Sequence, residues 1–263
     1  MSGSGPARPD LSLVIPVYNE RDNLRPLWEE VRTALAPLGR PYEILLIDDG
    51  STDGSGETMD AMAREHPEIR PIHFEKNAGQ SAGFAAGFRL ARGPIVVTLD
   101  ADLQNDPADI PDLVAKLESS GAGAVVGIRA GRQDSLVRKV SSKVGNYVRN
   151  TLTQDHVTDT GCSLKAYRKD AVMRIKMYRG MHRFLPTLIR TEGYEVLEMP
   201  VRHRERRHGA SKYGIANRAL SGLADVLAVR WMRARTIRYR IRGEEGADGA
   251  ERARAGASEG APP

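Results

Sequence analysis

The sequence predicts an α/β protein built on a mostly parallel, doubly wound sheet with helices on both faces. Two observations predict this fold. Short apolar runs rich in Val, Ile and Leu alternate along the first half of the chain with amphipathic stretches of about 10–15 residues, the pattern typical of βαβ units. Several of the apolar runs end abruptly in polar clusters, and ligands of such sheets bind outside the carboxyl ends of the strands.

The first half of the chain is expected to form regular strand–helix units. The predicted strands are Leu11–Val17, Tyr42–Ile47, Ile69–Phe74, Ile95–Leu99 and Ala124–Ile128. Helices are predicted after four of these strands. They run from Asp22 to Leu35, from after the polar cluster ending at Asp53 to about Arg64, over Gln80–Ala91, and from about Ala108 to Ser119. Apolar residues recur at helical spacing in the first helix, and Asp22 suits its first turn. The small residues of the third helix predict close packing against the sheet.

The second half has a less regular pattern. We expect a helix over Leu136–Leu152, a turn at Asp159–Ser163, a strand over Leu164–Tyr167, a helix over Met181–Thr191, a strand over Glu195–Val201 and an amphipathic helix over Ile215–Arg235. The expected organisation is a disordered N-terminus over 1–10, one α/β domain over 11–213, a basic amphipathic segment over 214–242 and a disordered tail over 243–263.

Composition is that of a soluble globular protein, with 263 residues, 40% of them hydrophobic and 28% charged. The single cysteine, Cys162, excludes an intrachain disulfide and suits a reducing cytoplasm. No apolar run approaches the ~18–20 residues of a membrane span, and residues 1–10 do not resemble a signal peptide.

The net charge of +5 is concentrated in one segment. Residues 201–242 carry 12 Lys and Arg against 2 Asp and Glu, whereas residues 1–200 carry 25 against 27. A local cluster of this kind predicts a local anionic partner. A nucleic-acid partner is not expected, because it would leave the acidic clusters elsewhere in the chain unexplained.

Asp100 and Asp102 follow the predicted strand Ile95–Leu99. Side chains alternate along an extended chain, so both carboxylates leave the strand end on the same side. Two adjacent carboxylates repel each other unless a cation lies between them, and Mg²⁺ or Mn²⁺ suits such a pair. A lone Asp-x-Asp is more often a solvated turn or a cap. Here the clusters Tyr18–Glu20 and Asp48–Asp49 are expected at the same sheet edge, which favours a ligand site.

Several nucleotide-binding and metal-binding motifs are absent from the sequence. It has no Gly-x-x-x-x-Gly-Lys loop, no Gly-x-Gly-x-x-Gly after the first strand, and no histidine spacing typical of zinc. His203 and His208 are interpreted as exposed loop residues or phosphate contacts. An acidic sheet edge, a basic loop and no nucleophile dyad together indicate a phosphate-bearing donor whose departing diphosphate is stabilised electrostatically.

Five motifs occur together in the sequence: Val14–Glu20 (Val-Ile-Pro-Val-Tyr-Asn-Glu), Ile47–Asp53 (Ile-Asp-Asp-Gly-Ser-Thr-Asp), Asn77–Gly79, Asp100–Gln104 (Asp-Ala-Asp-Leu-Gln), and the loop Arg206-x-x-Gly209-x-Ser211-Lys212. In this order and spacing the chain resembles the family 2 glycosyltransferases of the GT-A fold. The likeness is greatest to their polyprenyl-phosphate branch, the dolichyl-phosphate mannosyltransferases and undecaprenyl-phosphate sugar transferases. It covers about residues 11–235.

The resemblance implies a set of site residues. The nucleoside would be held by Pro16, Tyr18, Glu20, Ile47 and Asp49; the metal by Asp100, Asp102 and Gln104, with the backbone of Ala101 near the donor; the diphosphate or sugar by Arg129, Arg206 and Lys212; and the acceptor phosphate by Arg138 and Ser142. Plain strand-end packing is the alternative for Pro16 and Ile47. A solvated helix surface is the alternative for Arg138 and Ser142. The turn at Asp159–Gly161 is expected to shape the acceptor side.

The resemblance also implies an activity. It is the inverting transfer of a hexose from GDP-mannose or a UDP-sugar to a dolichyl or undecaprenyl phosphate, with Mg²⁺ or Mn²⁺ as cofactor. Two alternatives stay open, a family 2 transferase with a saccharide or soluble acceptor, and a non-catalytic sugar-nucleotide-binding scaffold.

Many relatives continue from the basic loop into transmembrane helices, and this sequence does not. Instead, residues 226–241 interleave apolar side chains with arginines. The sequence therefore predicts a peripheral protein on the cytoplasmic face of the inner membrane, with this helix in the lipid interface. Docking of the helix on its own domain or on a membrane-protein partner is the alternative.

Overall fold

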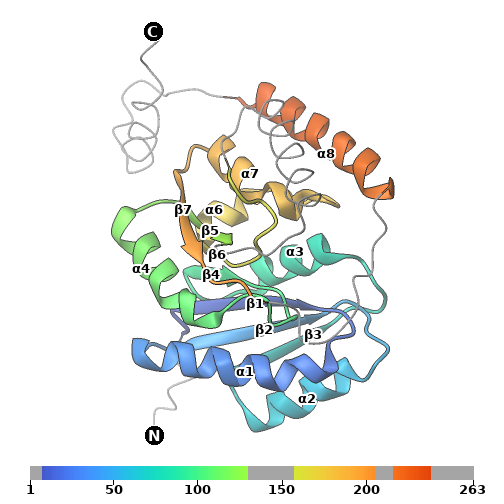
Figure 1. Ribbon diagram of the computed structural model, residues 1–263, viewed down its shortest axis with the longest axis vertical. Helices are drawn as coiled ribbons and strands as arrows, with labels where there is room; N and C mark the ends of the chain where they lie inside the picture. Colours follow the sequence, from blue (N-terminus) through green and yellow to red (C-terminus); the bar gives the residue numbers. More distant parts are fainter. Residues whose placement is uncertain (1–7, 130–156, 205–215, 238–263) are drawn as a thin grey trace, which may run out of the picture.

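The computed structural model of the chain describes residues 8–129, 157–204 and 216–237 (Figure 1). Its strands are β1 (Leu11–Val17), β2 (Tyr42–Asp48), β3 (Ile69–His73), β4 (Ile95–Thr98), β5 (Ala124–Arg129), β6 (Lys165–Arg168) and β7 (Val196–Val201). Its α-helices are α1 (Arg21–Leu35), α2 (Ser55–Glu65), α3 (Gln80–Leu90), α4 (Ile110–Ser120), α6 (Lys169–Met173), α7 (Leu185–Thr191) and α8 (Ala216–Ala234). Short 3₁₀ helices are η1 (Ala36–Leu38), η2 (Pro107–Asp109) and η3 (Met181–Phe184).

The described strands form one sheet in the order β3-β2-β1-β4-β6-β5-β7. The pairs β1–β2, β2–β3, β1–β4 and β5–β7 are parallel, whereas β6 runs antiparallel to both β4 and β5. The predicted mostly parallel α/β sheet is therefore confirmed. The sequence pattern did not reveal that β6 inserts between β4 and β5, nor did it predict α6.

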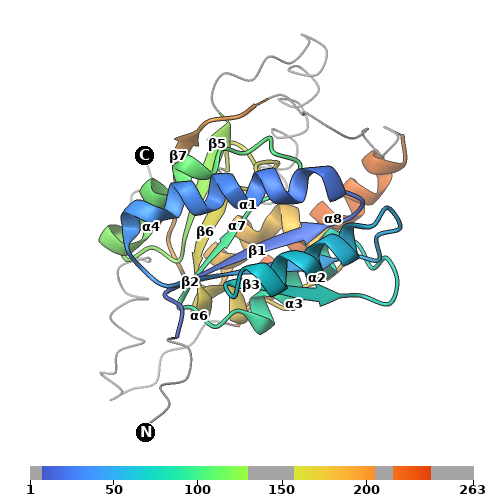
Figure 2. The same cartoon turned by 90° about the horizontal axis from the view of Figure 1, so that it is seen from below.

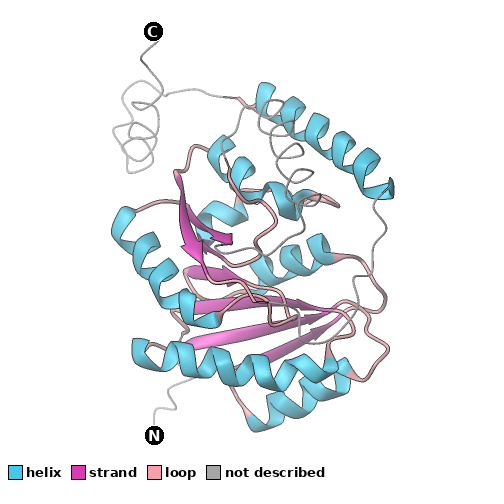
Figure 3. Cartoon of the chain, viewed as in Figure 1, coloured by secondary structure: helices cyan, strands magenta, loops and turns pink. Residues whose placement is uncertain are grey.

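Helices cover both faces of the sheet (Figures 2 and 3). On one face α1, α2 and α4 pack against alternate side chains of the strands, and on the other α3, α6 and α7 do so. The central strands are buried on both faces, which explains why their sequences are continuous apolar runs rather than alternating ones. The predicted helix over Leu136–Leu152 lies outside the described residues.

Helix α3 lies unusually close to β1, as its small residues predicted. A Cβ atom built on Gly87 would lie 2.1 Å from Cγ1 of Val14, and one on Gly83 would lie 3.1 Å from Cβ of Pro16. Real Cβ atoms do not approach other atoms as closely as 2.1 Å, so only glycine fits at position 87. This contact fixes the amino end of α3 beside the carboxyl ends of the parallel strands.

Helix α8 docks on the domain through one face only. Val226 and Val229 are buried in a cluster with Met181, Phe184 and Leu188 of η3 and α7. The sequence left open whether this helix docks on its own domain. The face that carries Val226 and Val229 does so.

Another stripe of α8 stays in solvent. Leu223, Leu227 and Trp231, spaced four residues apart, are 45%, 52% and 63% exposed. Within the described ranges no helix is both long enough and apolar enough to cross a membrane.

Candidate active site

The carboxyl ends of β1 and β2 are joined by hydrogen bonds between their loops. Asn19, with a left-handed φ of 55°, accepts a hydrogen bond on Oδ1 from the backbone N–H of Thr52 at 2.7 Å. The N–H of Asn19 in turn donates to Oγ of Ser51 at 3.0 Å. The two polar clusters that the sequence predicted at one edge are therefore brought together.

Asp49 is buried and engaged with backbone. Its carboxylate accepts hydrogen bonds from the N–H of Ala78 at 2.6 Å and from the N–H of Gly79 at 2.9 Å. This arrangement connects the end of β2 to the Asn77–Gly79 motif that precedes α3. These hydrogen bonds show that the carboxylate of Asp49 holds the loop before α3. They do not test the predicted contact between Asp49 and the nucleoside.

The other residues predicted at the nucleoside differ in exposure. Tyr18 is 36% exposed, whereas Ile47 is fully buried in the core with Phe84. Pro16 is half-buried beneath Gly83, and the amide of Asn23 donates to Oε2 of Glu20 at 2.6 Å. Ile47 contributes packing at the strand end, whereas the Tyr18 side chain is partly in solvent.

Asp100, Asp102 and Gln104 follow β4 in a tight turn. Leu103, buried between them, has a φ of 59°, a left-handed conformation that is uncommon for a bulky residue and that clusters at functional sites. The N–H of Gln104 donates to Oδ1 of Asp102 at 3.2 Å. Ala101 is buried in the core, so its methyl group anchors the turn, with Asp100 half-buried and Asp102 buried on either side of it.

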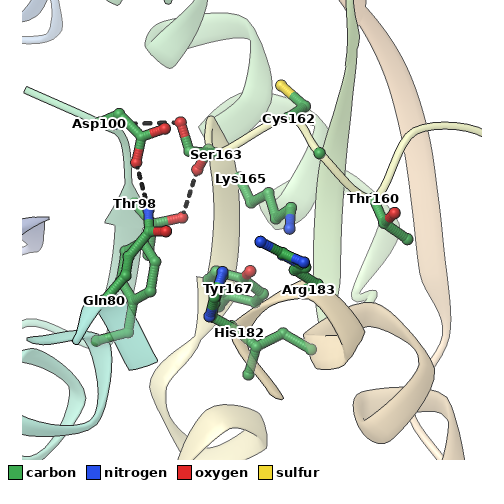
Figure 4. A pocket seen from close by; sticks show the side chains of 13 residues that line it. Gln80, Thr98, Asp100, Thr160, Cys162, Ser163, Lys165, Tyr167, His182 and Arg183 are labelled. Carbon is green, nitrogen blue, oxygen red and sulfur yellow. Dashed lines mark hydrogen bonds between the residues drawn. The ribbon is translucent and has the colours of Figure 1, made fainter. Parts of the chain in front are cut away.

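Asp100 is oriented by two neighbours. Nε2 of Gln80, the first residue of α3, donates to its Oδ1 at 2.7 Å, and its own N–H donates to Oγ of Ser163 at 3.2 Å (Figure 4). Ser163 Oγ also accepts from Nδ2 of Asn105 at 2.6 Å. The turn after β4 and the segment before β6 are thus held in register.

Across residues 8–129, 157–204 and 216–237, no three His, Cys, Asp or Glu side chains gather in a geometry that holds a metal ion by themselves. The predicted set is of another kind. It has two carboxylates and one amide oxygen at a strand end, and Mg²⁺ sites with only one or two carboxylates are completed by substrate phosphates and water. The donor set fits a hard divalent cation that arrives with a phosphate ligand.

A cavity of about 290 Å³ lies beside Asp100. It is lined by Gln80, Phe84, Thr98, Asp100, Thr160, Gly161, Cys162, Ser163, Lys165, Tyr167, His182, Arg183 and Leu185, which come from α3, β4, the turn before β6, β6 and the η3–α7 segment (Figure 4). The predicted site-shaping turn at Asp159–Gly161 therefore contributes Thr160 and Gly161 to a cavity wall.

Three groups in the cavity have displaced pKa values. Burial, with the positive charges of Arg183 and Lys165, lowers the pKa of His182 to about 3, so its imidazole is neutral and hydrogen bonded to the Ser81 hydroxyl at 2.7 Å. Burial raises the pKa of Cys162 to about 11 and also raises the pKa of Tyr167. Thiol and phenol are therefore neutral at physiological pH.

Arg129, predicted at the diphosphate or sugar, forms a two-point ion pair with Asp159. Its Nε and one terminal nitrogen lie 2.7 and 2.8 Å from the two carboxylate oxygens. Burial opposes ionisation of Asp159, but the hydrogen bonds and charge of Arg129 outweigh it and hold the pKa of that carboxyl below its usual range. Arg129 thus holds the turn that lines the cavity.

The start of the basic loop is tied to the turn after β4. The N–H of Arg204 donates to the carbonyl of Gln104 at 2.8 Å, and its guanidinium pairs with Asp106 and Glu30. Arg202 pairs with Asp109. These ion pairs hold Arg202 and Arg204 in place. Together with the backbone hydrogen bond to Gln104, they fix this segment beside the turn that contains the predicted metal ligands.

His203, interpreted from the sequence as an exposed loop residue or a phosphate contact, is half-buried and forms a β-bridge with Asn105, so the first of these interpretations is wrong. Four predicted site residues, Arg206, Lys212, Arg138 and Ser142, lie outside the described residues.

Sequence reasoning missed much of the cavity lining. Gln80, Ser163, Lys165, His182 and Arg183 belong to no motif that was singled out. One signal was available for Lys165, a charged residue placed inside an apolar strand pattern, Leu164–Tyr167. The others come together only through the fold.

Comparison with protein families gives a match over most of the domain. The family described as Glycosyl transferase family 2 matches residues 12–176. A dodecaprenyl-phosphate galacturonate synthase from Rhizobium johnstonii is 38% identical over 237 residues, which are 89% of this chain and 69% of that protein. An undecaprenyl-phosphate 4-deoxy-4-formamido-L-arabinose transferase from Aeromonas hydrophila is 42% identical over 78% of this chain, which spans 63% of that relative's length.

Solved structures with the same fold include enzymes with bound nucleotide sugars. A mannosyltransferase from Pyrobaculum calidifontis in complex with GDP-Man and Mn²⁺ superposes with a TM-score of 0.61 at 20% identity, covering 97% of this chain and 77% of that one. A glucosyl-3-phosphoglycerate synthase from Mycobacterium tuberculosis in complex with Mn²⁺ and UDP-Glc gives 0.61 at 19% identity, covering 86% and 79%. At these identities the likeness concerns the fold, which is the predicted GT-A fold.

Proposed function

The chain belongs to glycosyl transferase family 2, and from that premise we propose that it transfers a sugar from a nucleotide donor to a polyprenyl phosphate. The observation that carries the proposal is the 38% identity to the dodecaprenyl-phosphate galacturonate synthase over 89% of this chain. The polar strand ends and the cavity beside Asp100 support it, because they offer a continuous sheet edge for a donor. The sugars named for the relatives differ, so they leave the sugar open.

In this proposal the nucleoside lies against Tyr18, Pro16 and Glu20 at the end of β1. Asp49 acts there through the loop whose amides it binds, and Ile47 supports the strand end from the core. The diphosphate then lies at Asp100 and Asp102, beside the backbone of Ala101. The sugar follows into the cavity, because the cavity adjoins Asp100 on the side away from β2.

Asp100, Asp102 and Gln104 would hold Mg²⁺ or Mn²⁺. Such an ion, when bound, neutralises charge on the nucleoside diphosphate as it leaves. Gln80 and Ser163 hold the carboxylate of Asp100 and its backbone in one orientation, so that the donor meets a fixed ligand set.

The acceptor determines what the chain must contribute to catalysis. A polyprenyl phosphate is already an oxyanion near neutral pH, since the second ionisation of such a monoester falls around pH 6. Its oxygen attacks the anomeric carbon directly, with inversion, and no strong general base is needed. The chain's residues position the two substrates and stabilise negative charge, with Arg206 and Lys212 proposed at the diphosphate and Arg138 and Ser142 at the acceptor phosphate.

The exposed stripe of α8 is proposed to lie in the lipid interface on the cytoplasmic face of the inner membrane. Leu223, Leu227 and Trp231 are exposed on a helix that also presents Arg230 to solvent, and the exposed Arg235 directly follows the helix. Aliphatic and Trp side chains beside arginines insert at the headgroup boundary and attract anionic lipid. The docked face, through Val226 and Val229, would then hold the domain near the membrane surface.

A donor screen tests the proposed reaction. Purified protein is incubated with Mg²⁺ or Mn²⁺, undecaprenyl phosphate in detergent and a panel of GDP- and UDP-sugars, and release of nucleoside diphosphate is measured with and without the lipid. Lipid-dependent release from a donor is the expected result. Transfer to a saccharide without response to the lipid would support the saccharide-acceptor alternative. Tight donor binding without any transfer would support the non-catalytic scaffold.

A further inference from the structure

The first turn of helix α3 contacts two walls of the cavity with consecutive side chains. Nε2 of Gln80 donates to Oδ1 of Asp100 at 2.7 Å, and Oγ of Ser81 lies 2.7 Å from Nδ1 of His182 in η3. The helix itself is held close to β1 at Gly87. One rigid helix therefore fixes the place of the His182 imidazole relative to the carboxylate of Asp100.

The hydrogen bond to Ser81 sets which ring nitrogen of His182 carries the proton. Ser81 is 6% exposed, and across residues 8–129, 157–204 and 216–237 its hydroxyl has no hydrogen-bond partner other than Nδ1 of His182. If Nδ1 were the donor, the proton of this buried hydroxyl would have no acceptor, which costs free energy. The favourable arrangement has the hydroxyl donating to Nδ1, so that a neutral imidazole carries its proton on Nε2.

The imidazole of His182 is neutral at physiological pH. Burial lowers its pKa to about 3, and the positive charges of Arg183 and Lys165 act in the same direction. Because Nδ1 already accepts a hydrogen bond, the ring offers a single further group, the Nε2–H donor. A group of this kind does not serve as a general base, but it donates a hydrogen bond to a neutral oxygen without changing its charge.

The Nε2 atom of His182 opens onto the cavity. Among the described residues, the buried side-chain atoms without a hydrogen-bond partner belong to Asn23, Tyr167 and His203, and Nε2 of His182 is not one of them. Since no described residue hydrogen bonds to Nε2, this atom is accessible rather than sealed. Figure 4 shows the imidazole among the side chains that line the cavity. The cavity wall therefore presents a fixed, uncharged donor.

The size and place of the cavity indicate which part of a ligand meets this donor. About 290 Å³ is at the small end of ligand pockets, which run from roughly 300 to 1,000 Å³, and suits one sugar ring rather than a whole nucleotide sugar. Its Asp100 end adjoins the proposed diphosphate position, so the ring that follows the diphosphate reaches the wall of His182. Phe84 packs beside the imidazole, with ring centroids 6.3 Å apart, and lines the same cavity.

We propose that His182 donates a hydrogen bond from Nε2 to one ring hydroxyl of the transferred sugar and so helps to determine which sugar is accepted, with Ser81 as its positioning residue. This inference rests on the proposed function and assigns a contact to its donor. A sugar that lacks the hydroxyl leaves the Nε2–H unpaired inside the cavity, and a site built to hydrogen bond a hydroxyl discriminates against such an analogue.

The test compares donors that differ by one ring hydroxyl. The probes are UDP-galacturonate, UDP-galactose, UDP-glucose and GDP-mannose, each with its analogues deoxygenated at C2, C3 or C4. Affinity is measured by calorimetry with Mn²⁺ and without lipid, and lipid-dependent release of nucleoside diphosphate is measured separately. For the parent sugar that binds most tightly, we expect the loss of one particular hydroxyl to weaken binding by about 10-fold, the effect of one uncharged hydrogen bond.

A double variant, Ser81→Ala with His182→Phe, keeps an aromatic ring in place and removes both members of the hydrogen bond, so that no unpaired group is left in its position. It should bind the parent sugar about 10-fold more weakly and lose its discrimination against that one deoxy analogue, while the other deoxy analogues keep their relative affinities. The affinity for UDP or GDP alone, which carries no sugar, should change by less than about 2-fold.

Ser81→Ala alone leaves the imidazole without the group that sets its tautomer. It should reduce the same discrimination by about 3-fold, and it carries the test if the double variant fails to fold. His66→Phe is the matched control, because His66 is also half-buried but stacks on Trp28 outside the cavity. Its discrimination between the parent sugar and every deoxy analogue should equal that of the wild type.

Three outcomes would overturn the contact. In the first, the variants keep the wild-type discrimination against every deoxy analogue, and lipid-dependent transfer leaves the proposed function standing. In the second, affinity falls equally for all ligands, UDP and GDP included, which shows a structural role only. In the third, donor affinities are unchanged but the KM for polyprenyl phosphate rises, which places the acceptor at His182. Loss of the one discrimination in binding, without lipid-dependent transfer by the wild type, would support the contact and refute the polyprenyl acceptor.

Discussion

The parallel half of the sheet, β1 to β4, and the mixed half, β5 to β7, use their polar and charged side chains differently. In the parallel half, Asp49 and Asn19 bind backbone amides of neighbouring loops at 2.6–3.1 Å. In the mixed half, Arg129 pairs with Asp159 across 30 residues of sequence, and Lys165 and Arg183 face a cavity. Polar groups of the first half connect the loops at the edge where the nucleotide is proposed to bind. Those of the second surround the cavity beside that edge, where the sugar is proposed to lie.

The largest expected effect tests the boundary between the halves, the turn after β4. Asp102→Ala should lower metal-dependent transfer by at least about 100-fold, because it removes a carboxylate from the proposed metal set. The thermal unfolding midpoint should stay near that of the wild type. Asp112→Ala, an exposed acid in the first turn of α4, is the control. An active Asp102→Ala protein would refute the metal assignment.

The second effect tests how tightly the parallel half is packed. Gly87→Ala places a methyl group 2.1 Å from Val14 and should destabilise the fold by about 2–3 kcal/mol, the cost of overpacking a core. Gly222→Ala in α8 is the matched variant, because nothing lies within 4 Å of its Cβ, and helix propensity predicts up to about 1 kcal/mol of stabilisation. Urea unfolding measures both. Equal effects would show that α3 is not held as closely as described.

The third effect tests the ion pair of the mixed half. Asp159→Asn should lower the free energy of unfolding by about 2 kcal/mol at pH 7, since it removes the negative charge that pairs with the half-buried Arg129 guanidinium. The folded-state pKa of Asp159 lies below its unfolded value, so the pair's contribution is full above about pH 4 and is lost as pH falls through the lower, folded value. The difference between wild type and variant in urea titrations should therefore shrink as pH falls below about 4. A difference that did not shrink with falling pH would show a contribution other than charge.

The smallest effect concerns the surface of the mixed half. Trp231→Ala should weaken binding to vesicles containing anionic lipid by about 10-fold, through loss of an exposed aromatic side chain from the interface. Ala224→Ser, on another exposed position of α8, is the control. A truncation after Tyr213 is less informative, because it also removes Val226 and Val229 from the domain core. Unchanged vesicle binding by Trp231→Ala would favour a protein partner for this stripe.

The elements of the parallel half were predicted nearly residue by residue, since each is a local pattern. β1 was predicted at its observed bounds, and the strand predicted over Tyr42–Ile47 extends by one residue to Asp48. The mixed half was predicted less well. Helix α6 has only five residues, too few for a periodic signal, and η3 occupies the first turn of the helix expected from Met181.

The sequence by itself determined the fold class, the polar strand ends and the position of the Asp100–Gln104 motif after a strand, because these depend on side-chain alternation and on spacing within a few residues. Only the tertiary structure decided which partners those side chains meet. It turned Asp49 toward a loop and Arg129 toward Asp159, and it enclosed Lys165 in a cavity. It also divided α8 into a docked face and an exposed stripe. The physical reason is that a cavity and an ion pair join residues far apart in the chain, and the order of strands that brings them together is not written in any local pattern.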